Sequence, residues 1–245
     1  KETLQMIRKM LAVSSAVALA LSTSVAIANS HNDALKEPTV MQKAQNEHEK
    51  LFALFAASDE RNLALNPVMA IFRGDMRRAD RLGDFLTDAH DLATRTNTQL
   101  NLSELAQIDR SKLDDTDKLA YDVFKYNQER ALEMSSPEIS ALTQVRPVNH
   151  FSGFHTFYPS FASGKGAAPF KTVEDYENNL SRHKDYIAIS DRAIERFQEG
   201  MESGVLETTL TIDRVIKQFD TQLAIPLKES QFWGPMKMLP DSFSD

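Results

Sequence analysis

A run of regularly spaced residues between Thr172 and Gly204 constrains the fold of this 245-residue chain more than any other feature. Thr172 with Asp175 resembles a capping box, and Gly204 is a natural C-terminal stop. The positions between them alternate intervals of four and three, the spacing of one helix face, and they are Tyr176, Leu180, His183, Ile187, Ser190, Ile194, Phe197 and Met201. The pattern predicts one helix of about 30 residues, packed inside a helical domain rather than in a free coiled coil.

Apolar residues elsewhere in the chain also keep helical spacing. Prolines end several of these patterns, at Pro67, Pro137 and Pro226. No alternating run is long enough to predict a strand. We therefore expect an all-α, multi-helix array, with further helices over residues 45–65, 80–100, 114–134 and 209–224.

The stretch from Val145 to Phe170 is predicted to be a long loop rich in aromatic residues. Ordered loops of more than about 12–15 residues are uncommon, and they usually line binding sites or are disordered. This loop carries too much apolar surface for a solvated linker, in Phe151, Phe154, Phe157, Tyr158, Phe161 and Phe170. We therefore expect it to be ordered against other parts of the protein.

The N-terminus has the pattern of a secretory signal peptide. Arg8 and Lys9 precede an uncharged apolar run over residues 11–28, which ends in Ala-Ile-Ala. A transmembrane anchor is the alternative, but the run barely reaches the roughly 18–20 residues that a span needs and contains several serines. We predict a signal peptide over residues 1–28, cleavage before Asn29, and a periplasmic or secreted helical region over residues 29–245.

The chain has no cysteine, which excludes disulfides, thiolate metal sites and the lipid anchor of a lipoprotein. Its net charge of −7 becomes −9 when the three basic residues and one acidic residue of the signal peptide are removed. An acidic chain disfavours nucleic acid and anionic membrane surfaces as partners. We therefore expect no nucleic-acid partner, and no membrane contact after cleavage.

Histidine spacing does not predict a metal site in this chain. A zinc peptidase of the gluzincin kind places two histidines one helical turn apart, with a glutamate between them that polarises the water. His48-Glu49 starts such a motif, but Phe52 stands where the second histidine would be. His150 and His155 could converge on a ligand without an evident third partner, and hydrogen bonds within an ordered loop are the alternative. We predict no metal ligand and no catalytic residue in this chain.

Three sequence motifs follow one another in a recognisable order. The first is NPVMAIFRGDMRRADRLGD, over residues 66–84. The second joins PVNHFSG, over residues 147–153, to PFKTVEDY, over residues 169–176. The third runs from GMESGV, which starts at Gly200, to Leu239-Pro240. Together they resemble the bacterial family called domain of unknown function 885, although Ile71 replaces a common threonine and His150 a frequent glutamine.

That resemblance has implications for fold and cofactor. Members of the family are longer, mostly helical and often exported, and they are grouped with zinc metallopeptidases whose zinc motif lies in the C-terminal half. The resemblance therefore implies that this chain is the N-terminal half of a larger helical metallopeptidase-like fold. It also implies that zinc is the cofactor of the full-length protein, that its ligands lie outside this chain, and that this chain alone is inactive.

The resemblance further implies a peptide or small-molecule substrate in a cleft that this half helps to form. The predicted loop from Val145 to Phe170 is our hypothesis for a substrate-facing surface, because it is dense in aromatic residues and has a place in the family pattern. Its candidate substrate-binding residues are Asn149, His155 and Tyr158. The alternative is a non-catalytic, exported helical binding or scaffold module, which the absence of zinc ligands favours.

Overall fold

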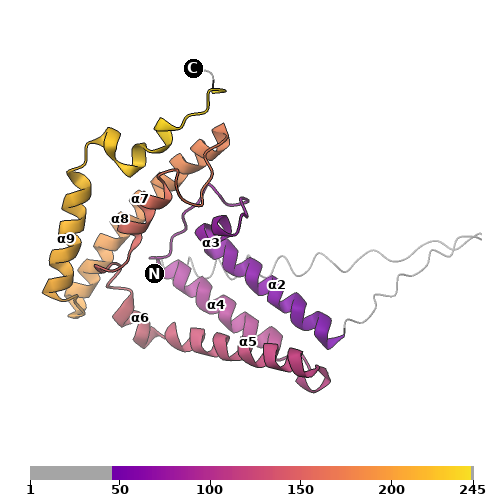
Figure 1. Ribbon diagram of the computed structural model, residues 1–245. Coiled ribbons are helices and arrows are strands. Elements are labelled where there is room, and N and C mark those ends of the chain that lie inside the picture. The colour runs from indigo at the N-terminus through magenta and orange to yellow at the C-terminus, as the bar shows by residue number, and fades with distance from the viewer. Residues whose placement is uncertain (1–45, 244–245) are drawn as a thin grey trace, which may run out of the picture. The chain divides into compact units, whose positions relative to one another are not determined.

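The computed structural model describes residues 46–243, which form eight α-helices and four short 3-10 helices without a strand (Figure 1). The α-helices are α2 Glu47–Leu65, α3 Pro67–Phe72, α4 Asp88–Leu105, α5 Asp115–Met134, α6 Pro137–Thr143, α7 Phe154–Phe161, α8 Val173–Ser203 and α9 Thr209–Leu223. The 3-10 helices are η1 Arg110–Lys112, η2 Leu227–Glu229, η3 Gln231–Trp233 and η4 Pro235–Lys237. The prediction of an all-α array is confirmed, whereas the predicted signal peptide lies outside the described residues.

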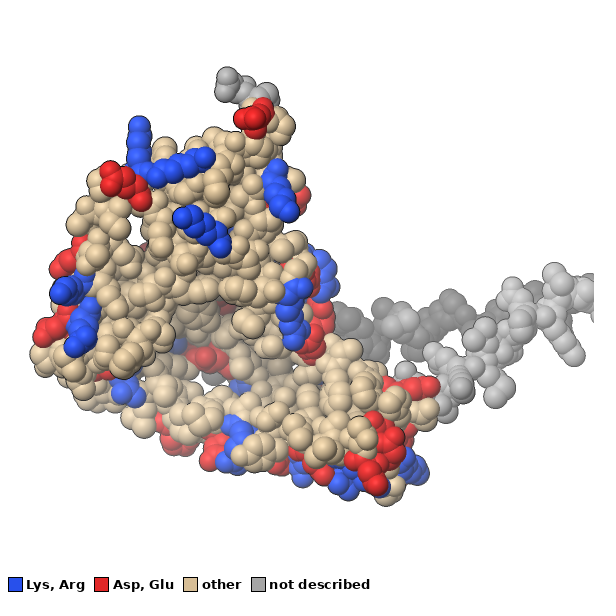
Figure 2. All heavy atoms as spheres, viewed as in Figure 1, with Lys and Arg blue, Asp and Glu red and all other residues tan. Residues whose placement is uncertain are grey.

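Helices α2, α4 and α5 pack around a small apolar core. Asp114 caps α5 by accepting the backbone N–H of Asp117 at 2.8 Å. Acidic side chains gather at the end of this group where α2 and α5 begin (Figure 2), and the helix macrodipole favours negative charge there. The buried members of the core are Leu51, Leu54, Leu105, Ile108 and Leu113.

The segment before α4 is irregular, although the sequence predicted a helix over residues 80–100. Helix α4 begins only at Asp88, so the predicted start is wrong. Side chains of α8 bind the backbone of this segment instead: Asp185 accepts the N–H of Leu82 at 2.7 Å, and Arg196 Nε donates to the carbonyl of Leu86 at 2.9 Å. These contacts satisfy backbone groups that a helix would have paired internally.

The predicted loop from Val145 to Phe170 contains a helix, α7, so the expectation of a stretch without secondary structure is wrong there. Gly153 precedes α7 and Pro159 lies inside it, and both residue types normally predict a break. Packing stabilises the helix, because Phe154, Tyr158 and Phe161 are buried. The expected ordering against other parts of the protein holds for these three aromatic side chains.

Helix α8 starts and ends as predicted but buries a different face. Both bonds of the capping box between Thr172 and Asp175 are present, and Gly204 ends the helix in the left-handed conformation, with φ 75°. Four residues of the predicted seam are 58% to 64% exposed: Leu180, Ile187, Ile194 and Met201. The buried row is Asn179, Arg182, Ile189, Ala193, Arg196 and Gly200. The prediction of the buried face is therefore wrong for those four residues, whereas His183 and Phe197 of the same seam are partly buried.

A second, larger apolar cluster joins α3, α7, α8 and α9. Ile71, Tyr158, Ile189 and Val215 are buried members from these four helices. Phe219 of α9 packs against the cluster from outside. Within residues 46–243, no helix combines the length and the apolar character that a bilayer crossing requires.

Candidate functional site

The turn before α7 is built around Asn149. Its side-chain oxygen accepts the backbone N–H groups of Phe151 and Ser152, at 2.9 and 3.0 Å. Such a side-chain acceptor replaces the backbone partner of a tight turn. The bonds fix the turn, and Gln218 of α9 holds the carbonyl of the next residue, His150.

His155 is fully buried, and Gln218 of α9 holds it in place. Gln218 Nε2 donates to the carbonyl of His150 at 3.0 Å, so the orientation of this amide is settled. Its oxygen, which can only accept, therefore receives the Nε2–H of His155 at 2.9 Å. The imidazole stacks on Phe219 with 5.1 Å between ring centroids. Its Nδ1 carries a buried lone pair without a partner among the described residues.

A second glutamine of α9 supplies a hydrogen-bond donor that the backbone of α7 lacks. Pro159 has no N–H, so the carbonyl of His155, four residues earlier, lacks its helical partner. Gln222 Nε2 donates to that carbonyl at 3.0 Å. A proline inside a helix of eight residues is therefore compatible with burial because α9 supplies the missing donor.

Tyr158 is also fully buried and ends a chain of hydrogen bonds that starts in α8. Arg182 donates to Asn179 Oδ1 at 3.3 Å, and Asn179 Nδ2 donates to His183 Nε2 at 3.2 Å. His183 must then carry its proton on Nδ1, from which it donates to the Tyr158 oxygen at 2.8 Å. Burial lowers the pKa of His183 and raises that of Tyr158, so both groups are neutral.

Arg182 is the largest side chain with almost no exposure, at 1%. It donates to the carbonyl of Ala79, and its guanidinium lies over the Phe161 ring, 5.5 Å from the centroid. Among the described residues it forms no ion pair, and its Nε has no partner. Burial lowers the pKa of Arg182, although a guanidinium stays charged in proteins. The positive charge of Arg182 is therefore stabilised by a backbone carbonyl, a side-chain amide and an aromatic ring.

A hollow of about 430 Å³ opens beside these buried groups, between α9 and the start of α7. Arg214 and Lys217 bring two positive charges to its wall, and neither forms an ion pair with another described residue. The other lining residues are His150, Thr156, Gln218, Thr221 and Gln222, so the described residues contribute no carboxylate to the wall. Two cations with hydroxyl and amide donors suit an anionic group.

The three sequence-predicted residues lie in one short segment, but their roles differ. The Asn149 side-chain oxygen accepts two backbone N–H groups of its own turn. His155 and Tyr158 are both 0% exposed. Their contact with substrate stays a prediction. Sequence reasoning missed Gln218 and Gln222, which join the segment to α9; the one available signal was their spacing of four on the polar side of an amphipathic helix.

The described residues do not fit a zinc site. Across residues 46–243, no group of three histidine, aspartate or glutamate side chains converges in a way that could hold a metal ion. His48 Nδ1 lies 2.7 Å from Asp117, and His155 is engaged by Gln218. The zinc ligands implied by the sequence resemblance are therefore not found in this part of the chain.

The described residues are all-helical, and a hollow with two cationic side chains, Arg214 and Lys217, lies beside a buried polar network. The family described as "Bacterial protein of unknown function (DUF885)" matches residues 67–245, and the chain belongs to that family. No curated protein and no solved structure matches the chain.

Proposed function

We propose that this chain forms the substrate-facing wall of an exported, zinc-metallopeptidase-like hydrolase. The observation that carries the proposal is the hollow lined by His150, Arg214 and Lys217. The hollow lies beside residues 147–153, which belong to the second family motif. Two cations, Arg214 and Lys217, line it in a chain whose net charge is −7. A local positive site in an acidic protein attracts a negatively charged part of a substrate.

A carboxylate of a peptide fits this chemistry. Arg214 can bind both carboxylate oxygens with its planar fork, and Lys217 adds a point charge. Thr156 and Thr221 offer hydroxyl donors at the same wall. The role of this half is therefore to bind and orient a peptide or another small substrate with a free carboxylate.

Zinc is the proposed cofactor of the full-length protein, on the strength of the family resemblance. Its ligands and the general base would lie outside residues 46–243, because these residues do not fit a metal site. Export to the periplasm or beyond rests on the N-terminal pattern of residues 1–28. The acidic charge of the chain speaks against a nucleic-acid partner.

Exposed apolar residues on α8 support a place in a larger protein. Leu180, Ile187, Ile194 and Met201 follow one another every seven residues along one side of the helix and are all more than half exposed. Apolar side chains at this interval form the seam by which one helix packs against another. We propose that the zinc-binding half of the protein covers this row.

The test compares purified residues 29–245 with the product of the complete gene. Zinc content and cleavage of peptides are measured for both. Zinc and activity in the complete product, but not in residues 29–245, would support the proposal. A complete product without bound zinc and without peptidase activity would contradict it.

The hollow is tested separately by Lys217→Gln in the active protein. We expect the Michaelis constant for a peptide with a free carboxylate to rise several-fold, while turnover stays unchanged, because an interaction made equally in ground and transition states is lost. Lys184→Gln, at an exposed position of α8, is the matched control. Equal constants for the two variants would exclude the hollow as a substrate site.

The alternative function is a non-catalytic, exported helical binding or scaffold module. One observation favours it: a pocket lined by amide, hydroxyl and aromatic side chains lies between α2, α4 and α5, beside the small apolar core of these helices. A complete gene product that is soluble, monodisperse and free of metal, and that binds a ligand in this pocket, would establish the alternative in place of the hydrolase.

A further inference from the structure

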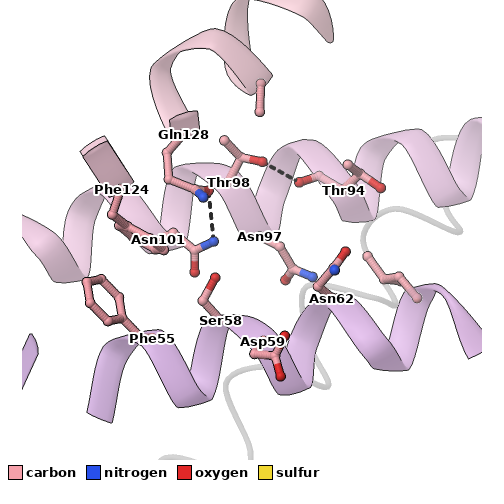
Figure 3. Close-up of a pocket in the computed structure, with 12 residues that line it drawn as sticks. Phe55, Ser58, Asp59, Asn62, Thr94, Asn97, Thr98, Asn101, Phe124 and Gln128 are labelled. Carbon is pink, nitrogen blue, oxygen red and sulfur yellow. Dashed lines mark hydrogen bonds between the residues drawn. The ribbon is translucent and has the colours of Figure 1, made fainter. Parts of the chain in front are cut away.

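The pocket between α2, α4 and α5 is lined by seven uncharged polar side chains, four apolar side chains and one carboxylate (Figure 3). It encloses about 420 Å³, within the range of roughly 300–1,000 Å³ that small-molecule sites occupy. Four carboxamides line it, together with two phenylalanines at one end: they belong to Asn62, Asn97, Asn101, Gln128, Phe55 and Phe124.

The pocket carries no free charge. Among the described residues that line it, Asp59 alone is ionisable, and Arg73 binds both oxygens of that carboxylate, at 2.7 and 2.8 Å. Because this pair is neutral as a whole, neither of its members presents an unpaired charge to a ligand. Ligands that depend on a charge are therefore disfavoured.

The inner wall is held rigidly by hydrogen bonds. Asn101 is 5% exposed; its oxygen accepts Arg61 Nη2 at 2.6 Å, and its nitrogen donates to Gln128 Oε1 at 2.9 Å. Thr98 is 6% exposed and donates to the carbonyl of Thr94 at 2.9 Å. These bonds fix the positions of the groups and leave the second N–H of Asn101 and the lone pairs of Thr98 for a ligand.

The end of the pocket is apolar and aromatic. Phe55 of α2 and Phe124 of α5 lie with 4.9 Å between ring centroids and planes tilted by 46°. Figure 3 shows both rings at one end of the row of polar side chains. A ligand in this pocket therefore meets an aromatic surface on one side and paired donors and acceptors on the other.

We propose that this pocket binds an uncharged carbohydrate of one or two sugar rings. Sugar hydroxyls both donate and accept, as carboxamides and threonine hydroxyls do, and the C–H face of a sugar ring can lie on the phenylalanines. An extended peptide is less suited, because it docks on free backbone groups of a sheet edge, which helices do not offer. An amphipathic helix is less suited because it needs an apolar groove.

The experiment uses saturation-transfer NMR on the whole chain with glucose, N-acetylglucosamine and the disaccharide cellobiose at millimolar concentrations. The charged comparator is glucuronate, and the peptide comparator is dialanine. We expect saturation transfer to at least one neutral sugar, strongest at its ring C–H protons, and weaker transfer to glucuronate and dialanine.

Asn97→Leu removes a donor and an acceptor from the wall at nearly constant volume, and we expect it to weaken sugar binding about tenfold or more. Asn127→Leu, at an exposed position of α5 outside the pocket, is the matched control and should leave binding unchanged. Ser58→Leu, on the opposite wall, serves as a second blocking variant if Asn97→Leu does not fold. The proposal is overturned if no neutral sugar binds, if dialanine binds better, or if a folded blocking variant binds like the control.

Discussion

Gln218 joins α9 to the segment before α7 through one carboxamide, and its replacement by leucine tests the site directly. Gln218→Leu conserves volume and helix propensity, but it leaves the His150 carbonyl and the His155 Nε2–H without their partner. His155 is 0% exposed, so water cannot replace that partner. An unsatisfied buried group costs about 1–3 kcal/mol. Because His150 is only partly buried, water can reach its carbonyl more easily, and we expect a total loss of about 1–3 kcal/mol in the free energy of unfolding.

Urea denaturation followed by far-ultraviolet circular dichroism measures this loss, and an unchanged slope with denaturant would show that the unfolded state is not altered. Gln198→Leu, at an exposed position of α8, is the matched control and should change stability by less than about 0.5 kcal/mol.

A double-mutant cycle separates the two lost bonds. His155→Phe keeps a ring on Phe219 and removes the N–H that Gln218 accepts. In the His155→Phe background, Gln218→Leu should therefore cost less than in the parent protein, by about 1 kcal/mol or more. The reasoning would be refuted if Gln218→Leu were no more harmful than Gln198→Leu, or if its cost were the same in both backgrounds.

Three further predictions concern α8. Gly200→Ala should destabilise the protein by about 1–3 kcal/mol in thermal or urea unfolding, because the new Cβ would lie 2.8 and 3.0 Å from two backbone carbonyl oxygens; a gain of stability, as helix propensity alone predicts, would show that the approach is not tight. Burial holds the pKa of His183 below its ordinary 6.5, so the unfolded chain binds the proton more readily and stability should fall as the pH drops below about 6.5. That fall should be smaller in His183→Gln, and equal slopes in pH-dependent unfolding would exclude His183 as its source. Ile187→Ser should change stability by less than about 0.5 kcal/mol, whereas Ile189→Ser, 3% exposed, should cost about 2–5 kcal/mol; similar costs in urea denaturation would contradict the observed buried face.

Features that depend on neighbouring residues could be predicted from the sequence. The caps at Asp114 and Thr172 and the stop at Gly204 are local, since each uses groups within a few residues. The start of α4 could not be predicted, because arginine and aspartate side chains of α8 compete for the backbone before it. The buried face of α8 was missed for a related reason: two of its buried positions are arginines, Arg182 and Arg196, which a hydrophobic pattern places outside.

The candidate site shows the same division between local and distant information. Aromatic density and the family pattern drew attention to His155 and Tyr158. Their partners are distant in sequence, because Gln218 is 63 residues from His155 and His183 is 25 residues from Tyr158. The two cations of the hollow, Arg214 and Lys217, belong to an ordinary polar helix side when α9 is considered alone. A single sequence does not show which segment that side will face.

The segment before α4 takes its final path only after α8 has been synthesised, because side chains of α8 bind its backbone. The bond from Leu82 to Asp185 spans 103 residues, and that from Arg196 to Leu86 spans 110. A ribosome adds roughly 5–20 residues per second, so this segment emerges several seconds before the side chains that fix its path. Helices α2, α4 and α5 have their partners close in sequence and can associate first. The connection between α3 and α4 must then stay unfixed until α8 has left the ribosome.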